Sequence, residues 1–325
     1  MNNSSLFRSV CYNASAEGPK VIVLGAVHGN EPCGTQAIYR LMSALDQGEL
    51  KLQKGQLTLI PITNPLAWDK RSRMGERNLN RNFRRHDAPQ DYEDKLCNQL
   101  APLLEDHDVL LDLHSFHTPG KPFVMLGPRN NSGELEAFSF ADKEQDWASR
   151  LGVERMLEGW LETYARGVAR RTANPNASLR AQMLSTDPGY GVGTTEYMRS
   201  HGGYALTLEC GQHDDPKAPE IAYEAICRTL SHLNLLALPK PEITANIEIL
   251  RLIDVIDRDH EGDQFVQEWR SFDSLVTGDV IGRRHDDSLV TAPMNGFVVF
   301  PNPNAMPGNE WFYLATHSDR ARCGT

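Results

Sequence analysis

The sequence predicts an α/β protein: a mixed, mostly parallel sheet flanked by helices, followed by a small all-β domain. Two observations lead to this fold class. Up to about residue 236, short aliphatic runs alternate with longer segments of helical spacing, as in strands joined by crossover helices. Beyond residues 238–241 (Leu-Pro-Lys-Pro), short β-type runs are separated only by turn residues. We therefore expect two domains, residues 1–238 and 242–325.

Continuous apolar runs mark the expected strands of the larger domain. Residues 21–27 (VIVLGAV) form a mostly β-branched run, typical of a strand buried on both faces. Gly29-Asn30 ends this run, and Asn64-Pro65 ends the second one, because Gly, Asn and Pro favour turns. The expected strands are residues 21–27, 57–62, 109–113, 123–126 and 205–208, and the expected helices are residues 31–45, 91–105, 154–171 (with a Gly-rich loop after it) and 219–236.

The small all-β domain is expected from about residue 242 onward. Gly, Pro, Asn and Asp separate its short runs, a pattern typical of strands joined by tight turns. The expected strands are residues 247–255, 265–269, 288–291, 296–300 and 311–315.

Composition narrows the classes of protein that this chain can belong to. With 325 residues, 40 % hydrophobic and 23 % charged, the chain has the make-up of a folded globular protein. Its formal net charge of −10 argues against a nucleic-acid partner, which needs a basic face. The first twenty residues hold no apolar signal region, and no window reaches the roughly eighteen apolar residues of a membrane span. We expect neither secretion nor membrane insertion.

Cysteine usage also favours a protein that is not secreted. The six cysteines are scattered without paired spacing, and no CxxC motif occurs. This favours reduced thiols in a cytoplasmic protein over a disulfide framework or a structural zinc ribbon. The sequence leaves the oligomeric state open, so a homo-oligomer is compatible with it.

Polar residues at the ends of the expected strands predict a metal site. His28 and Glu31 form a His-x-x-Glu motif in the turn after the first strand, and His114 directly follows the third strand. Since the carboxyl ends of parallel strands share one edge of a sheet, these side chains should meet there. Two imidazoles and one carboxylate form a common open zinc shell, although such ligands also accept other divalent ions. Either motif alone arises often by chance, whereas their joint occurrence favours a metal centre.

Two further acidic residues extend this site. Glu209 ends the apolar run at residues 205–208, where burial should raise its carboxyl pKa. It could instead pair with an arginine or cap a helix; as a catalytic group it would be the general base that takes a proton from metal-activated water. Asp112 could orient a metal ligand through a hydrogen bond, without binding the metal itself.

A basic segment suggests an anionic substrate. Residues 70–85 (KRSRMGERNLNRNFRR) contain seven of the 33 Lys and Arg residues of an otherwise acidic chain. A solvated charge run is the common explanation for such a segment. Here it follows the strand-ending Asn64-Pro65, and arginines bind carboxylates through paired hydrogen bonds. The segment therefore indicates an anionic group on the substrate, or stabilisation of an oxyanion.

Five motifs, taken in order, carry a family resemblance: Gly25-Ala26-Val27-His28-Gly29-Asn30-Glu31, Asn64-Pro65, Arg73 with Leu79-Asn80-Arg81, Asp112-Leu113-His114-Ser115, and Leu208-Glu209. Together they resemble the succinylglutamate desuccinylase/aspartoacylase family, a branch of the zinc-carboxypeptidase-like fold. The motifs span about residues 21–211. The tail, with Phe300-Pro301-Asn302-Pro303, looks like the small C-terminal domain of these proteins.

The resemblance implies a role for each matching residue. His28, Glu31 and His114 match the ligands of one Zn²⁺ per chain, and Glu209 matches the general base. The implied reaction is hydrolysis of a carboxylate-bearing N-acyl amino acid to an acid and an amino acid. Of the arginine-rich motif, Arg73 matches the residue that polarises the scissile carbonyl, and Asn80 and Arg81 match the pair that holds the α-carboxylate.

One position departs from the family pattern. Members that cleave acylated aspartate carry an additional arginine before the catalytic glutamate, whereas Glu196 stands near that position here. If Glu196 lined the pocket, it would repel a second substrate carboxylate. This leaves the acyl group and the amino acid open.

Two other functions share these residues. A carboxypeptidase acting on short peptides would use the same metal, base and carboxylate clamp; the small C-terminal domain favours the deacylase by analogy, because it can cover the cleft. A non-catalytic zinc-binding homologue would keep the metal shell, but the presence of Glu209 speaks against it.

Overall fold

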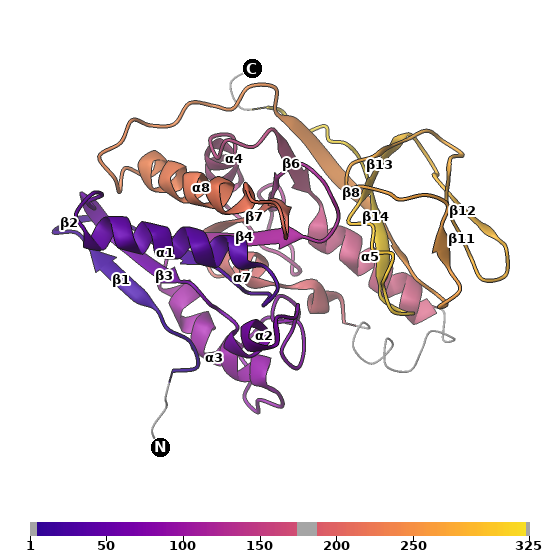
Figure 1. Ribbon diagram of the computed structural model, residues 1–325, viewed down its shortest axis with the longest axis horizontal. Helices are drawn as coiled ribbons and strands as arrows, with labels where there is room; N and C mark the ends of the chain where they lie inside the picture. The colour runs from indigo at the N-terminus through magenta and orange to yellow at the C-terminus, as the bar shows by residue number, and fades with distance from the viewer. Residues whose placement is uncertain (1–4, 174–186, 323–325) are drawn as a thin grey trace.

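An eleven-stranded sheet runs through the molecule in the order β1-β3-β2-β4-β7-β5-β6-β8-β14-β13-β10. The structure is a computed structural model that describes residues 5–173 and 187–322, and Figure 1 shows its elements. The strands of the large sheet are β1 (Val10–Asn13), β2 (Ala16–Leu24), β3 (Lys54–Ile60), β4 (Val109–Phe116), β5 (Phe123–Met125), β6 (Arg155–Glu158), β7 (Tyr204–Gln212), β8 (Glu248–Asp257), β10 (Ser274–Leu275), β13 (Gly296–Val299) and β14 (Glu310–His317).

Helices cover both faces of the sheet, as expected. The alternating residues of β2 explain this: Val21 and Val23 belong to one buried cluster, with α1 and α8, and Ile22 and Leu24 belong to another, with α3 and α7. Figure 1 shows α1 and α8 side by side on one face. The helices are α1 (Pro32–Asp46), α2 (Pro65–Lys70), α3 (Tyr92–Glu105), α4 (Ala141–Ala148), α5 (Trp160–Ala173), α7 (Thr194–Ser200) and α8 (Ala218–His232), with a 3-10 turn η1 (Pro188–Gly191).

The strands that carry the site are parallel neighbours. β2 pairs in parallel with β3 and β4, and β4 pairs in parallel with β7. The strand β5 then runs antiparallel to β7, so the sheet is mixed but mostly parallel in this region. The predicted fold class is confirmed.

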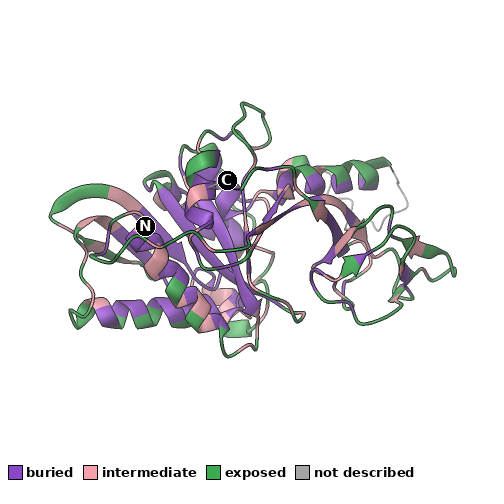
Figure 2. Ribbon diagram, turned by 90° about the horizontal axis from the view of Figure 1, so that it is seen from above, coloured by how far each residue is buried: buried purple, intermediate pink, exposed green. Residues whose placement is uncertain are grey.

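The C-terminal strands continue the same sheet. β8 pairs in parallel with β6, and β14 pairs antiparallel with β8, so the hydrogen-bonded ladder crosses the expected boundary near residue 242. Figure 2 shows these strands extending away from the larger body. A separate three-stranded sheet joins β9 (Gln264–Phe265), β11 (Val280–Arg283) and β12 (Leu289–Thr291). The C-terminal part has its own core around Trp269, Trp311 and Phe312, and its division into a domain stays a prediction.

Two local predictions were wrong. The helix expected over residues 154–171 begins only at Trp160, because Arg155–Glu158 forms β6 between β5 and β8. Met156 and Leu157 are both buried there, a pattern that is ambiguous between a strand and a buried helix. The strand expected over residues 265–269 is shorter, since β9 covers only Gln264–Phe265.

Candidate active site

The structure brings the three expected metal ligands together. His28 lies in the loop after β2, Glu31 is the N-cap of α1, and His114 lies on β4. All three are buried. His28 Nδ1 lies 2.9 Å from Glu31 Oε1, and His114 Nδ1 lies 2.8 Å from Glu31 Oε2. The ligand atoms of the three residues lie within 4.8 Å of one another, so one small cation could contact all of them.

Close backbone packing shapes the loop that holds His28. A Cβ atom at Gly29 would lie 2.0 Å from the backbone of Ala67 in α2, so only glycine fits. Asn64, the other polar residue at a strand end, has a structural role. Its Oδ1 accepts a hydrogen bond from the Ala67 backbone N–H (3.1 Å) and caps α2.

A second layer of polar groups fixes both histidine rings. Asn78 Oδ1 is hydrogen-bonded to His28 Nε2 (2.9 Å), and Asp112 Oδ2 lies 3.1 Å from His114 Nε2. Thr194 in turn donates a hydrogen bond to Asp112 (2.5 Å). Such partners on the far ring nitrogen orient histidine ligands and leave the other nitrogen for a metal. In both rings that remaining nitrogen is Nδ1, which faces Glu31.

The electrostatics of the three residues suit a cation. Burial, and then the charge of Arg73, lower the pKa of His28 to about 4. Burial alone would raise the pKa of Glu31, but His28 and His114 outweigh it and hold the pKa well below its usual range. Burial would lower the pKa of His114, yet Asp112 and Glu31 outweigh it and hold the pKa well above. Glu31 is thus an anion between neutral His28 and protonated His114, whose proton a bound metal ion would displace. Two imidazoles and one carboxylate are a donor set that fits Zn²⁺.

Glu209 lies beside this group. β4 and β7 pair so that His114 is opposite Glu209. Its Oε2 atom is buried and has no hydrogen-bond partner in the described part of the chain. Burial raises the pKa of Glu209 to about 8, more than the neighbouring His114 lowers it. A carboxyl group with such a pKa is suited to take up and return a proton near neutral pH.

The basic segment does not form one anion-binding surface, because its side chains diverge. Arg73 reaches the candidate metal ligands: its Nη1 donates to Glu31 Oε1 (3.2 Å), while half of its side chain is exposed. Arg85 instead pairs with Glu105 at the surface, and Lys70 bonds to the Gly75 carbonyl.

A buried carboxylate holds the loop between Arg73 and Arg81. Glu93 on α3 is fully buried. Its carboxylate accepts hydrogen bonds from the backbone N–H groups of Gly75, Glu76 and Arg77, at 3.0 to 3.3 Å, and from Asn64 Nδ2 (2.9 Å). This loop conformation is therefore fixed by α3.

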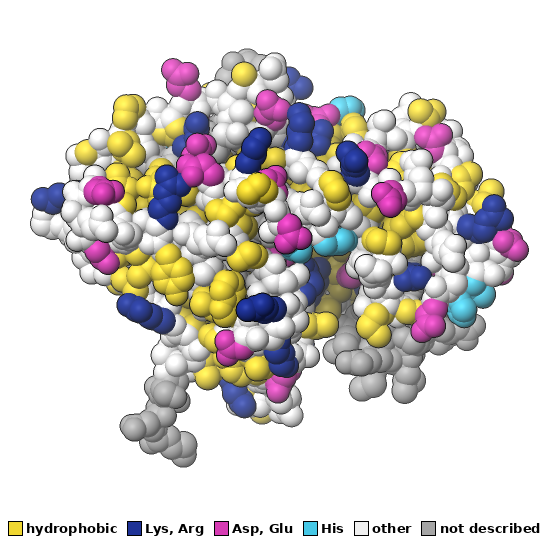
Figure 3. Space-filling model, in the orientation of Figure 1, with side chains coloured by type: hydrophobic (Ala, Val, Ile, Leu, Met, Phe, Trp, Pro, Cys, Tyr) yellow, Lys and Arg dark blue, Asp and Glu magenta, His cyan; other side chains and the backbone are white. Residues whose placement is uncertain are grey.

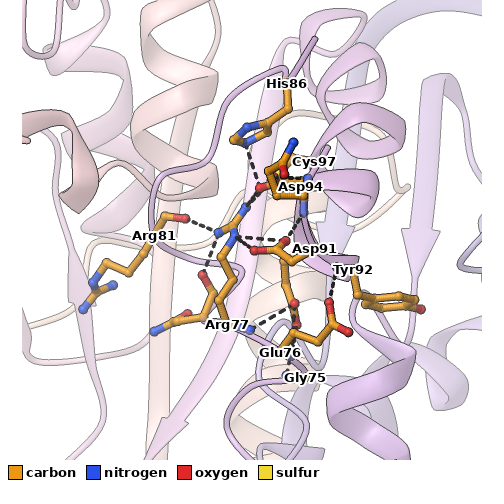
Figure 4. Close-up of polar contacts among 12 residues, drawn as sticks. Gly75, Glu76, Arg77, Arg81, His86, Asp91, Tyr92, Asp94 and Cys97 are labelled. Atoms are coloured by element: carbon orange, nitrogen blue, oxygen red, sulfur yellow. Dashed lines mark hydrogen bonds and ion pairs between the residues drawn. The ribbon is translucent and has the colours of Figure 1, made fainter. Parts of the chain in front are cut away.

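Arg77 completes the loop. Figure 4 shows its guanidinium between Asp91 and Asp94, with ion pairs of 3.0 and 2.8 Å. The guanidinium also donates to the backbone carbonyls of Asn78 and Arg81. In the same view the Arg81 carbonyl faces Arg77 while the Arg81 guanidinium points away. Arg77 thereby holds the backbone of Arg81 at its carbonyl group.

The nearby acidic group of Glu76, Asp91 and Glu93 could by spacing hold a cation. Each carboxylate, however, already accepts hydrogen bonds: Glu76 from the Tyr92 N–H, Asp91 from Arg77, and Glu93 from the loop backbone. These carboxylates have a structural role.

The substitution Arg77→Met should destabilise the protein by about 3 kcal/mol, because it removes the guanidinium group that pairs with both Asp91 and Asp94. It should also raise KM, since the loop that carries Arg81 loses its anchor. Thermal unfolding and steady-state kinetics measure the two effects. Arg84→Met, which removes an exposed arginine of the same segment, is the control. Equal stability of the two variants would contradict the anchoring role.

Asn80 contacts α7, and the Arg81 side chain contacts α5. Asn80 Oδ1 accepts a hydrogen bond from the Thr194 N–H (2.9 Å), which leaves the Asn80 Nδ2 group to donate. A Cβ atom at Gly193 would lie 2.0 Å from Asn80 Oδ1, so this contact requires glycine. Arg81 Nη1 donates to the Asn80 carbonyl (2.8 Å), and its guanidinium lies over the Trp160 ring.

Glu196, which would repel a second substrate carboxylate if it lined the pocket, has structural partners for its carboxylate. Glu196 Oε2 accepts a hydrogen bond from the Gly193 N–H (2.9 Å) at the start of α7. Its Oε1 accepts from Thr195 (2.9 Å) and lies 3.4 Å from Arg199 Nη1. The carboxylate is part of a buried network around Arg199 that also includes Glu144 and Glu136, both 2.9 Å from the guanidinium.

This network should make the stability of the folded chain depend on pH. Burial raises the pKa of Glu136 from 4.5 to about 8, against the pull of Arg199. The folded chain thus holds a proton that the unfolded chain releases, so the stability from this group is lost as pH rises from about 4.5 to 8. Glu136→Gln should therefore flatten the fall of the unfolding temperature between pH 5 and 9. Identical pH profiles of wild type and variant would contradict this assignment.

Several site residues were not foreseen. His213 is hydrogen-bonded to Ser115 Oγ (2.8 Å), next to the candidate ligand His114 in sequence. Glu310 and Tyr313 of β14 lie near Arg81. His213 follows Glu209 by four residues and could have been noted. Figure 3, drawn in the orientation of Figure 1, shows histidine side chains at the centre of the visible face. They lie beside a hollow where the larger body meets the C-terminal strands.

Comparison with known proteins agrees with the resemblance. The model of the succinylglutamate desuccinylase/aspartoacylase catalytic domain matches residues 17–122. A succinylglutamate desuccinylase of Vibrio vulnificus is 24 % identical over 314 residues, which cover 91 % of this chain and 80 % of that protein. In the described part of the chain, no helix combines the length and apolar character that a membrane span requires.

Solved structures show the same fold. The crystal structure of succinylglutamate desuccinylase from Vibrio cholerae matches with a TM-score of 0.70 at 18 % identity, over 95 % of this chain and 85 % of that one. The crystal structure of a succinylglutamate desuccinylase/aspartoacylase from Rhodobacter sphaeroides matches with a TM-score of 0.69 at 16 % identity, over 96 % and 90 %. The architecture of the sheet and its C-terminal extension is therefore shared with these proteins.

Proposed function

We propose that the chain is a zinc-dependent deacylase of the succinylglutamate desuccinylase/aspartoacylase family, which hydrolyses the amide bond of an N-acyl amino acid; the match of that family's catalytic-domain model to residues 17–122 and the similarity to a succinylglutamate desuccinylase support this. The observation that carries the proposal is the convergence of His28, Glu31 and His114 beside the unpartnered carboxyl oxygen of Glu209. A metal-ligand set next to a proton-accepting group is what amide hydrolysis by water requires.

His28, Glu31 and His114 would hold the Zn²⁺ ion, through the nitrogens and oxygens that already face one another. When bound, the ion would polarise the scissile carbonyl and lower the pKa of water. Asn78 and Asp112 keep the histidine rings in place, so the ligand set is oriented before the ion arrives.

Glu209 moves the proton. Its carboxylate accepts a proton from the attacking water as the new C–O bond forms, and returns it to the nitrogen as the C–N bond breaks. A group with a pKa of about 8 can perform both transfers near neutral pH.

Arg73 and the Asn80–Arg81 pair position the substrate. Arg73, partly exposed and within reach of Glu31, would donate to the carbonyl oxygen as negative charge develops on it. The Nδ2 group of Asn80, which has no hydrogen-bond partner among the described residues, and the Arg81 guanidinium would bind the α-carboxylate beside the amide.

Purified zinc-loaded protein should release free amino acid and free acid in equal amounts from members of a panel of N-acyl amino acids. The panel varies the acyl group (acetyl, succinyl) and the amino acid. Peptides of ten residues serve as the comparison, because a carboxypeptidase would release their C-terminal residue. Release from the peptides but not from the panel would replace the deacylase by the carboxypeptidase.

A further inference from the structure

The guanidinium of Arg81 lies in an aromatic subsite and is largely unpaired. It is 4.7 Å from the centre of the Trp160 ring and 5.6 Å from that of Tyr164. Within residues 5–173 and 187–322, its side chain makes one hydrogen bond, to the Asn80 carbonyl. Its other N–H groups are therefore available to a carboxylate, as the proposed function requires.

The C-terminal strand β14 supplies a second donor to this subsite. The Tyr313 ring lies 5.4 Å from that of Trp160 and 6.2 Å from that of Phe300, and only 4 % of the residue is exposed. Its hydroxyl is buried without a hydrogen-bond partner in the described chain. Burial, and then Glu310, raise the pKa of Tyr313 well above its usual range, so the hydroxyl stays protonated and can donate. A buried hydroxyl without a partner is destabilising, and a bound acceptor would remove this cost.

Glu310, at the start of β14, brings negative charge to the same place. Among charged groups, it has the largest effect on the pKa of Arg81, and it also raises the pKa of Tyr164 and Tyr190. Its ion pair in the described structure is a long one, 3.8 Å to Arg171.

Arg171 has a better partner than Glu310. Its guanidinium binds Asp257 through two hydrogen bonds of 2.6 and 2.7 Å. Glu310 is consequently neutralised only in part, and about a quarter of its side chain (26 %) is exposed. Its carboxylate is accessible to a ligand.

Charge balance decides which amino acid fits. Arg81, Arg171, Asp257 and Glu310 have a formal sum of zero, and a substrate α-carboxylate brings it to minus one. A side-chain carboxylate would add a second negative charge beside Glu310. A side-chain ammonium group would instead restore neutrality and gain the aromatic faces, since cations are attracted to them.

We propose that Glu310 and Tyr313 form the specificity subsite for the amino-acid part of the substrate. Tyr313 donates to the carboxylate that Arg81 binds, and Glu310 selects N-acyl amino acids with a positively charged side chain over those with a carboxylate. The inference rests on the proposed deacylase function. It separates this chain from relatives named for succinylglutamate, whose amino acid carries a side-chain carboxylate.

The first test compares kcat/KM for the Nα-acetyl and Nα-succinyl derivatives of lysine and ornithine with those of glutamate and aspartate. We expect the basic substrates to be favoured at least about tenfold, the ratio that one well-placed charge can give. Glu310→Gln should narrow this ratio and Glu310→Arg should invert it. Glu268→Gln, which alters an exposed glutamate of the C-terminal part, should leave it unchanged.

The outcomes separate the two proposals. A wild-type preference for glutamate or aspartate, or a ratio unaffected by Glu310→Gln, would overturn the role of Glu310 while leaving the deacylase intact. No hydrolysis of any member would overturn the deacylase and this inference with it.

The second test is Tyr313→Phe, which removes only the hydroxyl. It should raise KM about tenfold with little change in kcat, as expected for a lost hydrogen bond to a charged group, and leave the unfolding temperature unchanged or higher. A purely structural role predicts the opposite: a lower unfolding temperature and an unaltered KM.

Discussion

Glu209→Gln should lower kcat by roughly 10³-fold, the usual contribution of a positioned acid–base group. The amide keeps the size of the carboxyl group but cannot accept the proton of the attacking water or return it to the leaving nitrogen. KM should change little, because Glu209 is not among the proposed carboxylate-binding residues. Steady-state kinetics on the best substrate of the panel measures both parameters.

Zinc content is the control for this variant. Glu209 is not one of the three proposed ligands, so Glu209→Gln should bind as much zinc as the wild type. Replacing the buried carboxyl group, whose pKa burial raises to about 8, should also make the protein more stable at pH 9. Full turnover by Glu209→Gln would remove the proposed proton transfer.

His114→Ala should abolish tight zinc binding, and activity with it, because two of three ligands rarely hold the ion. It also removes one partner from each of the buried carboxylates of Asp112 and Glu31, so the variant should be less stable than the wild type at every zinc concentration. Metal analysis after gel filtration and thermal unfolding with and without zinc measure these effects.

His317→Ala is the matched control, since His317 is largely exposed at the end of β14. It should retain zinc, activity and stability. One tightly bound zinc per chain in His114→Ala would mean that the ligand set is wrong.

The core of the site could be predicted because it depends on strand ends. His28, His114 and Glu209 follow or end continuous apolar runs, and parallel neighbours bring such positions to one edge of a sheet. His114 and Glu209 lie opposite each other in the parallel pair β4–β7, as this rule predicts. The local sequence was sufficient here because each strand is buried on both faces.

The specificity subsite could not be predicted in the same way. Tyr313 reaches Trp160 only because β14 pairs with β8, and β8 pairs with β6. The strand β6 was expected to be part of a helix, so this connection was lost. No local pattern around residue 313 indicates which distant aromatic ring it contacts.

The arginine-rich segment was hard to interpret for a different reason. Its density of arginines indicates a role in binding an anion, but only some of these side chains lie at the site. Glu93 ties the loop backbone to α3, and the arginines along the loop have different partners. Arg73 faces Glu31, Arg77 is held between Asp91 and Asp94, and Arg81 lies against Trp160. The buried carboxylate that fixes the loop conformation, that of Glu93, lies on α3. The sequence of the segment alone could not reveal this conformation.

The most direct test of a zinc-dependent deacylase is a stoichiometric titration. Metal-free protein receives increasing amounts of zinc, and the bound ion and the rate of amide hydrolysis are measured in the same samples. Both should rise together and level off at one zinc per chain, with little hydrolysis before zinc is added. Full hydrolysis without bound metal, or one bound zinc per chain with no hydrolysis of any N-acyl amino acid, would contradict the account.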